Sequence, residues 1–182
     1  MATTSKVLTY QDWLKLPEVE GVEEVVNGEI VKMPPNKWNH TRVVEALAHQ
    51  LRARLNPEAI HVVTSVFGLV VRPEPLALRV PDLAIFHANQ IVEQDGYIHS
   101  APELVVEMLS PANTRAERAE KLKDYESLGV PEVWVVSPEA QTVEVLLLQD
   151  GRLTTTRLLR EGELKPTHFP DAAVDIAAIW PK

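Results

Sequence analysis

A glutamate inside an apolar segment is the residue of this chain that most clearly suggests chemistry. Glu107 interrupts the apolar run 104–109, which is bounded by Pro102 and by Ser110-Pro111. A run of this length between turn signals is typical of a buried strand, where successive side chains alternate between the two faces. An ionised carboxylate in such a place is costly unless a cation meets it. The position of Glu107 therefore predicts a cationic partner, and a metal ion is the usual one.

Two further acidic residues lie in comparable surroundings, among apolar neighbours on predicted strands. Glu24 belongs to the segment 22–26, and Asp82 follows Pro81 at the start of 80–86. Oxygen ligands from separate strands are what Mg²⁺ or Mn²⁺ requires, and such ions keep waters that can act as nucleophiles. Lys121, on a predicted helix, could be a fourth member. The pattern indicates a carboxylate site for a divalent cation.

Structural interpretations of the same residues remain open. Glu107 could pair with an arginine such as Arg115 or Arg118. Lys121 stands four residues after Glu117, which is the spacing of a solvated pair on a helix surface. A site at Lys121 requires instead that its helix packs on the strand of Glu107, with the lysine facing the carboxylates.

Composition narrows the class of protein. The 182 residues carry a formal net charge of −8. Hydrophobic residues make up 45% and charged residues 24%, which is typical of a globular protein. We expect one domain spanning residues 1–182. The negative charge argues against non-specific binding to nucleic acid, but not against a metal-dependent nuclease. With no cysteine, disulfides and thiolate chemistry are excluded. No signal peptide or membrane-spanning run is apparent, so we expect a cytoplasmic protein without a membrane partner.

Hydrophobic periodicity and turn residues predict the elements that position the candidate residues. Asn27-Gly28 favours a tight hairpin turn between the first two strands. The predicted strands cover residues 22–26, 29–33, 60–71, 79–86, 104–109, 133–136, 143–148 and 153–159, and the predicted helices cover 9–17, 39–55, 114–128 and 175–180. This order indicates a mixed sheet flanked by helices, an α/β or α+β fold.

Several segments together resemble a known nuclease superfamily. They are EVVNGE at 24–29, Pro34 and His40, VPDLA at 80–84, PELVVEMLSP at 102–111, and EKLKDY at 120–125 continuing to GVPEVWVV at 129–136. These segments resemble the PD-(D/E)XK superfamily, and more closely its compact bacterial family described as "putative restriction endonucleases". The resemblance implies a restriction-endonuclease-like core with an N-terminal β-hairpin.

The resemblance also implies roles for individual residues. Asp82 and Glu107 would bind Mg²⁺ or Mn²⁺, and Glu24 would add a direct or water-mediated contact. One position departs from the superfamily pattern, because Leu109 stands where the motif places a lysine. In the bacterial family a lysine on the following helix takes this role, and the matching residue is Lys121. It would orient the attacking water and offset charge on the phosphate.

The implied reaction is metal-dependent hydrolysis of phosphodiester bonds in duplex DNA, with His40 and Arg42 as candidate nucleic-acid contacts. The apolar C-terminal hairpin and Trp180 could form a homodimer surface, although core packing explains them equally well. Two other functions stay open. A nuclease-like fold that no longer cuts could serve as a binding or assembly module, and a hydrolase of small phosphorylated substrates would use the same metal site.

Overall fold

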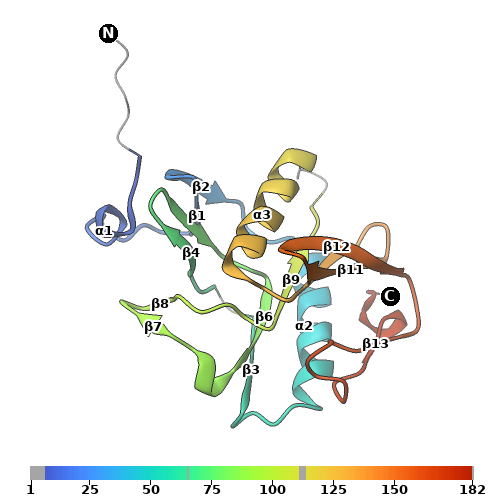
Figure 1. Ribbon diagram of the computed structural model, residues 1–182. Coiled ribbons are helices and arrows are strands. Elements are labelled where there is room, and N and C mark those ends of the chain that lie inside the picture. The colour runs from blue at the N-terminus through green and yellow to red at the C-terminus, as the bar shows by residue number, and fades with distance from the viewer. Residues whose placement is uncertain (1–6, 65, 111–113, 182) are drawn as a thin grey trace.

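Two six-stranded mixed sheets form the framework of the computed structural model, which describes residues 7–64, 66–110 and 114–181 (Figure 1). The first sheet has the order β2-β1-β5-β4-β8-β7 and the second has the order β12-β11-β10-β9-β6-β3. The strands of the first sheet are β1 (Val22–Val26), β2 (Glu29–Met33), β4 (Leu69–Pro73), β5 (Leu76–Arg79), β7 (Glu93–Gln94) and β8 (Tyr97–Ile98). The strands of the second are β3 (Ile60–Val63), β6 (Leu83–His87), β9 (Leu104–Met108), β10 (Glu132–Ser137), β11 (Thr142–Gln149) and β12 (Arg152–Leu159). The mixed α+β fold is confirmed.

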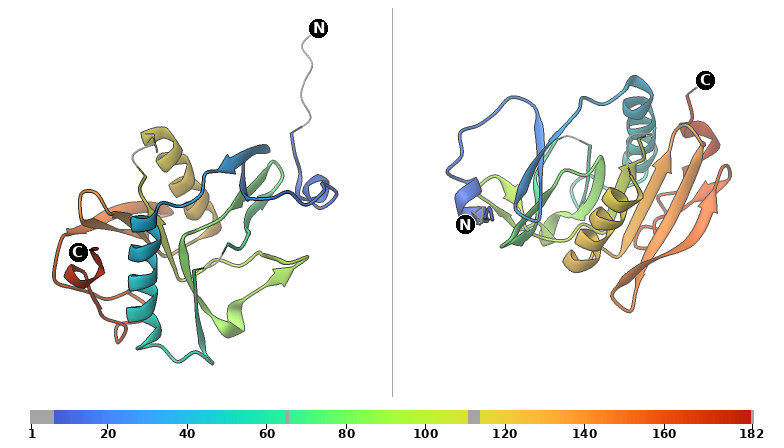
Figure 2. Two further views of the ribbon diagram at one scale, coloured as in Figure 1. Left: turned by 180° about the vertical axis from the view of Figure 1, so that it is seen from behind. Right: turned by 90° about the horizontal axis from the view of Figure 1, so that it is seen from above.

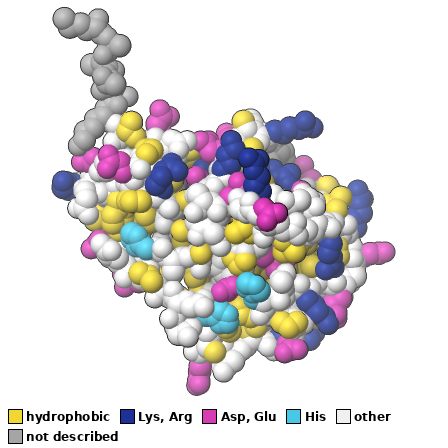
Figure 3. All heavy atoms as spheres, in the orientation of Figure 1, with side chains coloured by type: hydrophobic (Ala, Val, Ile, Leu, Met, Phe, Trp, Pro, Cys, Tyr) yellow, Lys and Arg dark blue, Asp and Glu magenta, His cyan; other side chains and the backbone are white. Residues whose placement is uncertain are grey.

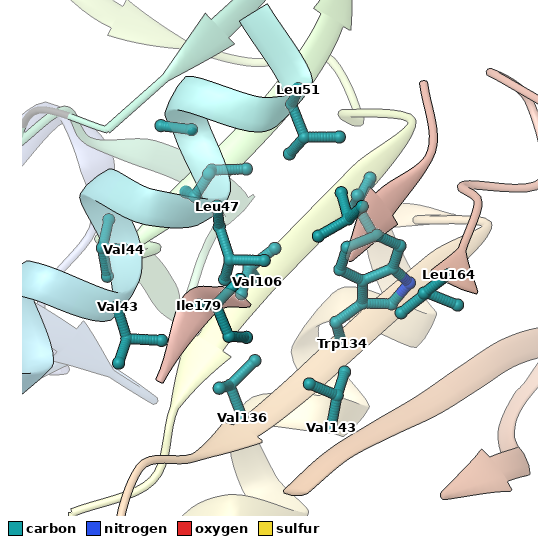
Figure 4. Packing of buried hydrophobic residues seen from close by; sticks show 14 of the residues in the cluster. Val43, Val44, Leu47, Leu51, Val106, Trp134, Val136, Val143, Leu164 and Ile179 are labelled. Atoms are coloured by element: carbon teal, nitrogen blue, oxygen red, sulfur yellow. The ribbon is translucent and has the colours of Figure 1, made fainter. Parts of the chain in front are cut away.

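The second sheet lies between two helices, α2 (Trp38–Arg52) on one face and α3 (Arg115–Leu128) on the other (Figure 2). Alternation along β9 explains this arrangement. Val106 packs with Leu47 of α2, and Val105 packs with Tyr125 of α3. The buried residues between α2 and this sheet form the α2 core, and those between α3 and this sheet form the α3 core. Figure 4 shows the α2 core, in which Trp134 of β10 is fully buried. Both faces of β9 are therefore covered, as its continuous apolar run predicts.

The ends of α3 follow from local sequence. Thr114 is its N-cap and forms a capping box with Glu117, in which each side chain accepts a hydrogen bond from the other residue's backbone N–H. Gly129 ends the helix with φ of 84°, a left-handed conformation that favours glycine. The predicted boundaries of this helix are confirmed, and they fix where Lys121 can point.

The predicted hairpin at Asn27-Gly28 is also confirmed. Asn27 and Gly28 have φ of 49° and 82°, and β1 pairs with β2 in the expected register. A side chain at Gly28 would lie 2.2 Å from Val7, so this position also requires a residue without Cβ. The hairpin holds Glu24 on a strand next to β5.

Two predicted long strands are wrong, because each is divided between the two sheets. The segment 60–71 forms β3 in the second sheet and β4 in the first. The segment 79–86 begins at Arg79, the last residue of β5 in the first sheet, and continues after a break as β6 in the second. Pro81 lies at the second break, where its missing N–H cannot continue a ladder. At the first break, Gly68 is close to Tyr97, which would lie 2.4 Å from an added Cβ. Asp82 consequently precedes β6 instead of lying within a strand.

Smaller differences concern short elements. The predicted helix 9–17 is shorter, as α1 (Tyr10–Trp13), although Thr9 caps it as expected. The C-terminal helix is a 3-10 turn, η2 (Ala177–Ile179). The remaining short elements were not predicted: η1 (Ala88–Gln90), β13 (Glu163–Leu164), β14 (Val174–Asp175) and the β7–β8 pair. Among the described residues no helix is long and apolar enough to cross a membrane.

Candidate active site

Pairing between β6 and β9 brings the two central carboxylates together. The strands are antiparallel with Leu83 opposite Val106, so the next position in this register sets Asp82 opposite Glu107. Asp82 is held at this point by two hydrogen bonds. Its Oδ2 accepts the backbone N–H of Met108 at 2.8 Å, and its Oδ1 lies 2.8 Å from His40 Nε2. The first turns of α2 thereby reach the same site.

Glu107 contacts two side chains of α3. Lys121 Nζ lies 2.9 Å from Glu107 Oε2, and the Tyr125 hydroxyl donates to Oε1. Lys121 and Tyr125 are one helical turn apart and therefore share a face of α3. A cationic partner of Glu107 is thus present within the chain, and the metal ion at this residue stays a prediction.

Glu24 completes the group from the first sheet. It is 3% exposed, and Lys121 Nζ lies 3.0 Å from its Oε1. The same oxygen accepts the N–H of Val80 at 3.0 Å, while Oε2 accepts from Arg79 NH1 at 3.0 Å. Both oxygens of Glu24 therefore already contact donors. Lys121 bridges Glu24 and Glu107, and so joins α3 to both sheets.

The charges in this group alter one another's proton affinities. Burial raises the pKa of Glu107 to about 7; Lys121 opposes this shift, and the charges of Asp82 and Glu24 reinforce it. Burial also acts to raise the pKa of Glu24, but Lys121 and Arg79 outweigh it and lower that pKa. For Lys121, burial acts to lower the pKa, but Glu107 and Glu24 outweigh it and raise that pKa. Lys121 is therefore a fixed positive charge at neutral pH, beside a carboxyl that retains a proton more readily than usual.

Lys121 does not pair with Glu117, and Arg118 does not pair with Glu107, in the structure. Glu117 uses its carboxylate in the capping box, and Arg118 pairs with Glu144 at 2.5 Å. Lys121 faces Glu107 and Glu24 instead. The geometric requirement for a helix-borne lysine is therefore met.

The remaining sequence candidates have different surroundings. His40 contacts Asp82, and Arg42 is exposed on the same helix, α2. Leu109 packs beside the α3 core, and Trp180 packs against the α2 core, which favours the core interpretation of that tryptophan. The roles of His40 and Arg42 in binding nucleic acid stay predictions, as does a homodimer.

Within 7–64, 66–110 and 114–181 no three His, Cys, Asp or Glu side chains are gathered closely enough to hold a metal ion. A hollow of about 340 Å³ lies elsewhere, at the edge strand β3, with Arg52 and His61 among its lining residues. None of the candidate catalytic residues lines this hollow, so the candidate site rests on the contacts among Asp82, Glu107 and Lys121 and not on a cavity. The metal role of Glu24, Asp82 and Glu107 stays a prediction.

Three residues of the site were not predicted as members. They are Arg79, Asp124 and Tyr125, all buried. Arg79 interrupts the apolar run 76–80, the same signal that identified Glu107, and could have been found in that way. Asp124 lies in a polar helix sequence and gives no such signal.

Comparison with protein families identifies the chain. A family model described as "Putative restriction endonuclease", Uma2, matches residues 9–177. The chain belongs to the Uma2 family. The match covers every candidate residue, from Glu24 to Lys121. No curated protein matches the chain.

A solved structure shows the same fold. It is a protein from Anabaena variabilis described as a putative nuclease belonging to DUF820, with 20% sequence identity to this chain and a TM-score of 0.77. The similarity covers 95% of this Uma2 chain and 97% of that protein. The arrangement of sheets and helices that gathers the candidate residues is therefore shared along nearly the whole of both chains.

Proposed function

We propose that this protein is a metal-dependent endonuclease that hydrolyses phosphodiester bonds in duplex DNA. The observation that carries the proposal is Lys121 placed 2.9 Å from Glu107, with Asp82 bonded to the backbone N–H of the next residue, Met108. Two carboxylates with an adjacent ammonium group are the parts that such hydrolysis needs. Membership of the Uma2 family supports the same class of reaction.

Asp82 and Glu107 fit a divalent cation of the Mg²⁺ type. Such ions are commonly bound by one or two carboxylates and complete their coordination with water and phosphate oxygens, so a third protein ligand is not required. The mutual repulsion of Asp82 and Glu107 contributes to the raised pKa of Glu107, and a cation between them would relieve it. Glu24 already contacts Lys121, Arg79 and the Val80 N–H, and its proposed part is to hold the lysine.

Bound Mg²⁺ or Mn²⁺ would polarise the phosphoryl group and lower the pKa of a bound water. The side chains of this chain supply the positioning. Tyr125 and Lys121 fix the two oxygens of Glu107, and His40 and the Met108 N–H fix those of Asp82. Lys121 then offsets the negative charge that develops on the phosphate as water attacks and the ester oxygen leaves.

Cationic side chains lie near this lysine, although the whole chain carries a net charge of −8. Figure 3 shows Lys and Arg side chains gathered in the region of α3. Helix α3 carries four of them, Arg115, Arg118, Lys121 and Lys123, beside four acids, Glu117, Glu120, Asp124 and Glu126, so the helix itself has no net charge. Phosphates are met by such local groups, whereas long-range attraction by the whole chain is unfavourable. Binding should therefore weaken as salt is increased.

Cleavage assays test the proposal directly. Supercoiled and linear duplex DNA would be incubated with the protein in Mg²⁺, in Mn²⁺ and in chelator, beside single nucleotides and small phosphate esters. Metal-dependent cutting of duplex DNA is the expected result. Hydrolysis of the small esters alone would support the small-substrate alternative, and DNA binding without any cutting would support a binding module.

A divalent cation is expected to stabilise the folded protein. A ligand that binds only the native state at about a hundred times its dissociation constant adds about 2.7 kcal/mol to the free energy of unfolding. Thermal melts with and without Mg²⁺ or Mn²⁺ measure this effect. Glu107→Gln should remove the shift, whereas Glu29→Gln, at an exposed acid of the β1–β2 hairpin, should leave it unchanged. A melting temperature that is the same without metal and in either metal would contradict the site.

A further inference from the structure

A buried arginine side chain lies next to the candidate site and takes no part in the chemistry proposed above. Arg79, the last residue of β5, is 4% exposed and is the only lysine or arginine buried among the described residues. A buried charge is retained only where its partners compensate the loss of water. The partners of Arg79 therefore indicate what it does.

The guanidinium group of Arg79 joins three elements. Its NH1 donates to Glu24 Oε2 of β1 at 3.0 Å, and its Nε donates to Asp124 Oδ2 of α3 at 2.7 Å. NH2 lies 2.6 Å from that same oxygen of Asp124, as an ionic contact without hydrogen-bond geometry. Because the guanidinium is planar and rigid, it sets the distance and angle between the two carboxylates.

Each of these two carboxylates is connected to Lys121, Glu24 by a direct contact and Asp124 by its place on the same helix. Glu24 uses its second oxygen to contact Lys121 Nζ at 3.0 Å. Asp124 follows Lys121 by three residues, and is therefore about one turn further along the same helix. The lysine is thus held at its charged end through Glu24 and at its backbone through Asp124. One arginine connects these two supports.

The charges around Arg79 also favour this position of the Lys121 ammonium group. Arg79 neutralises Asp124 and shares Glu24, so that Glu24 does not draw on the ammonium group of Lys121 alone. The remaining charge of Lys121 faces Glu107. Without Arg79, Glu24 would compete more strongly for the lysine and α3 would lose its buried ionic contact with β5.

We propose that Arg79 and Asp124 are positioning residues that hold Lys121 at the catalytic carboxylates. This inference rests on the proposed function of Lys121, and it assigns the pair an effect on turnover beyond its contribution to folding. A purely structural pair would lower stability without acting through the lysine.

Two conservative variants test the inference by activity. Arg79→Lys keeps the charge but loses the planar contacts, and Asp124→Asn keeps the shape but loses the charge. Each is expected to lower kcat about tenfold or more with little change in KM, as for other groups that orient a catalytic side chain. In a Lys121→Ala background the same changes should cause no further loss, because their effect passes through the lysine. Losses that multiply, or single variants that cut at the normal rate, would overturn the proposal.

A second measurement does not depend on DNA cleavage. Acetic anhydride acylates the neutral amine of lysine, so a buried and ion-paired lysine reacts slowly, and peptide mass spectrometry would compare Lys121 with exposed Lys123 in the same molecule. The ratio of Lys121 to Lys123 acylation should rise several-fold in Asp124→Asn and Arg79→Lys. An unchanged ratio in a folded variant would overturn the positioning role.

The two measurements separate the failure of this inference from failure of the proposed function. If the parent protein cuts no nucleic acid in any metal, the nuclease proposal fails and the acylation ratio still decides whether the pair holds Lys121. Circular dichroism melts establish that each variant folds. If Arg79→Lys does not fold, Asp124→Asn alone carries both measurements, since it retains the arginine and its contact with Glu24.

Discussion

Asp82→Asn and Glu107→Gln are each expected to abolish DNA cleavage while the fold survives. Either change removes a negative charge that we propose holds the cation, and with it the polarisation of the phosphate and the activation of water. Metal contributions of this kind amount to several kcal/mol, so the rate should fall by about a thousandfold or more. The comparison is kcat/KM on duplex DNA in saturating Mg²⁺, with circular dichroism as the check on folding.

The amide replacements are chosen because each keeps the shape of its carboxylate. The side-chain amide in Asp82→Asn retains an oxygen for the Met108 N–H, and the amide in Glu107→Gln retains one for Tyr125 or Lys121. Glu29→Gln is the matched control, since Glu29 is an exposed acid on β2. If Asp82→Asn and Glu107→Gln both fold and cut as fast as Glu29→Gln, the activity belongs to another part of the chain or to a contaminant.

The local sequence is sufficient to predict the features of this fold that depend on a few neighbouring residues. The turn at Asn27-Gly28 and the end of α3 at Gly129 both need left-handed backbone, which these residue types tolerate. Glu107 could be singled out because a carboxylate in an apolar run must have a partner, whichever element supplies it. The structure then identified that partner as Lys121.

The division of strands between the two sheets could not be predicted in this way. A segment such as 60–71 has the same apolar pattern whether it continues in one sheet or crosses to another, because its apolar side chains face a core in both sheets. Only the partners decide, and β3 pairs with β6 whereas β4 pairs with β5. Pairing over long separations is a property of the whole fold and is absent from local periodicity.

The supports of the site were missed for a related reason. Asp124 lies in the sequence KLKDYES, where an acidic residue on a helix is ordinarily solvated. Its burial follows from the contact of α3 with β5 through Arg79. A residue that acts only through a tertiary contact carries little signal in one sequence.

Lys121→Ala is expected to slow turnover by about a hundredfold or more while leaving metal binding nearly intact. The lost contribution is stabilisation of charge in the transition state, and a single group of this kind is worth about two to three orders of magnitude in rate, as an oxyanion-hole donor is. Glu24 keeps its bonds to Arg79 and Val80, so the variant should still fold. Lys123→Ala is the matched control, because Lys123 is exposed on the same helix. The measurements are kcat on duplex DNA and the metal-induced shift in melting temperature.

Returning a lysine to the strand sharpens this test. Leu109 directly follows β9 and, by strand alternation, lies on the same side as Glu107. Leu109→Lys in the Lys121→Ala background should recover part of the lost activity, because the ammonium group would reach the carboxylates from the strand instead of the helix. Recovery would show that catalysis depends on where the charge stands and not on which element carries it. Equal and small losses for Lys121→Ala and Lys123→Ala would instead mean that the Lys121 bridge between Glu24 and Glu107 is structural, and the catalytic assignment would then rest on Asp82 and Glu107 alone.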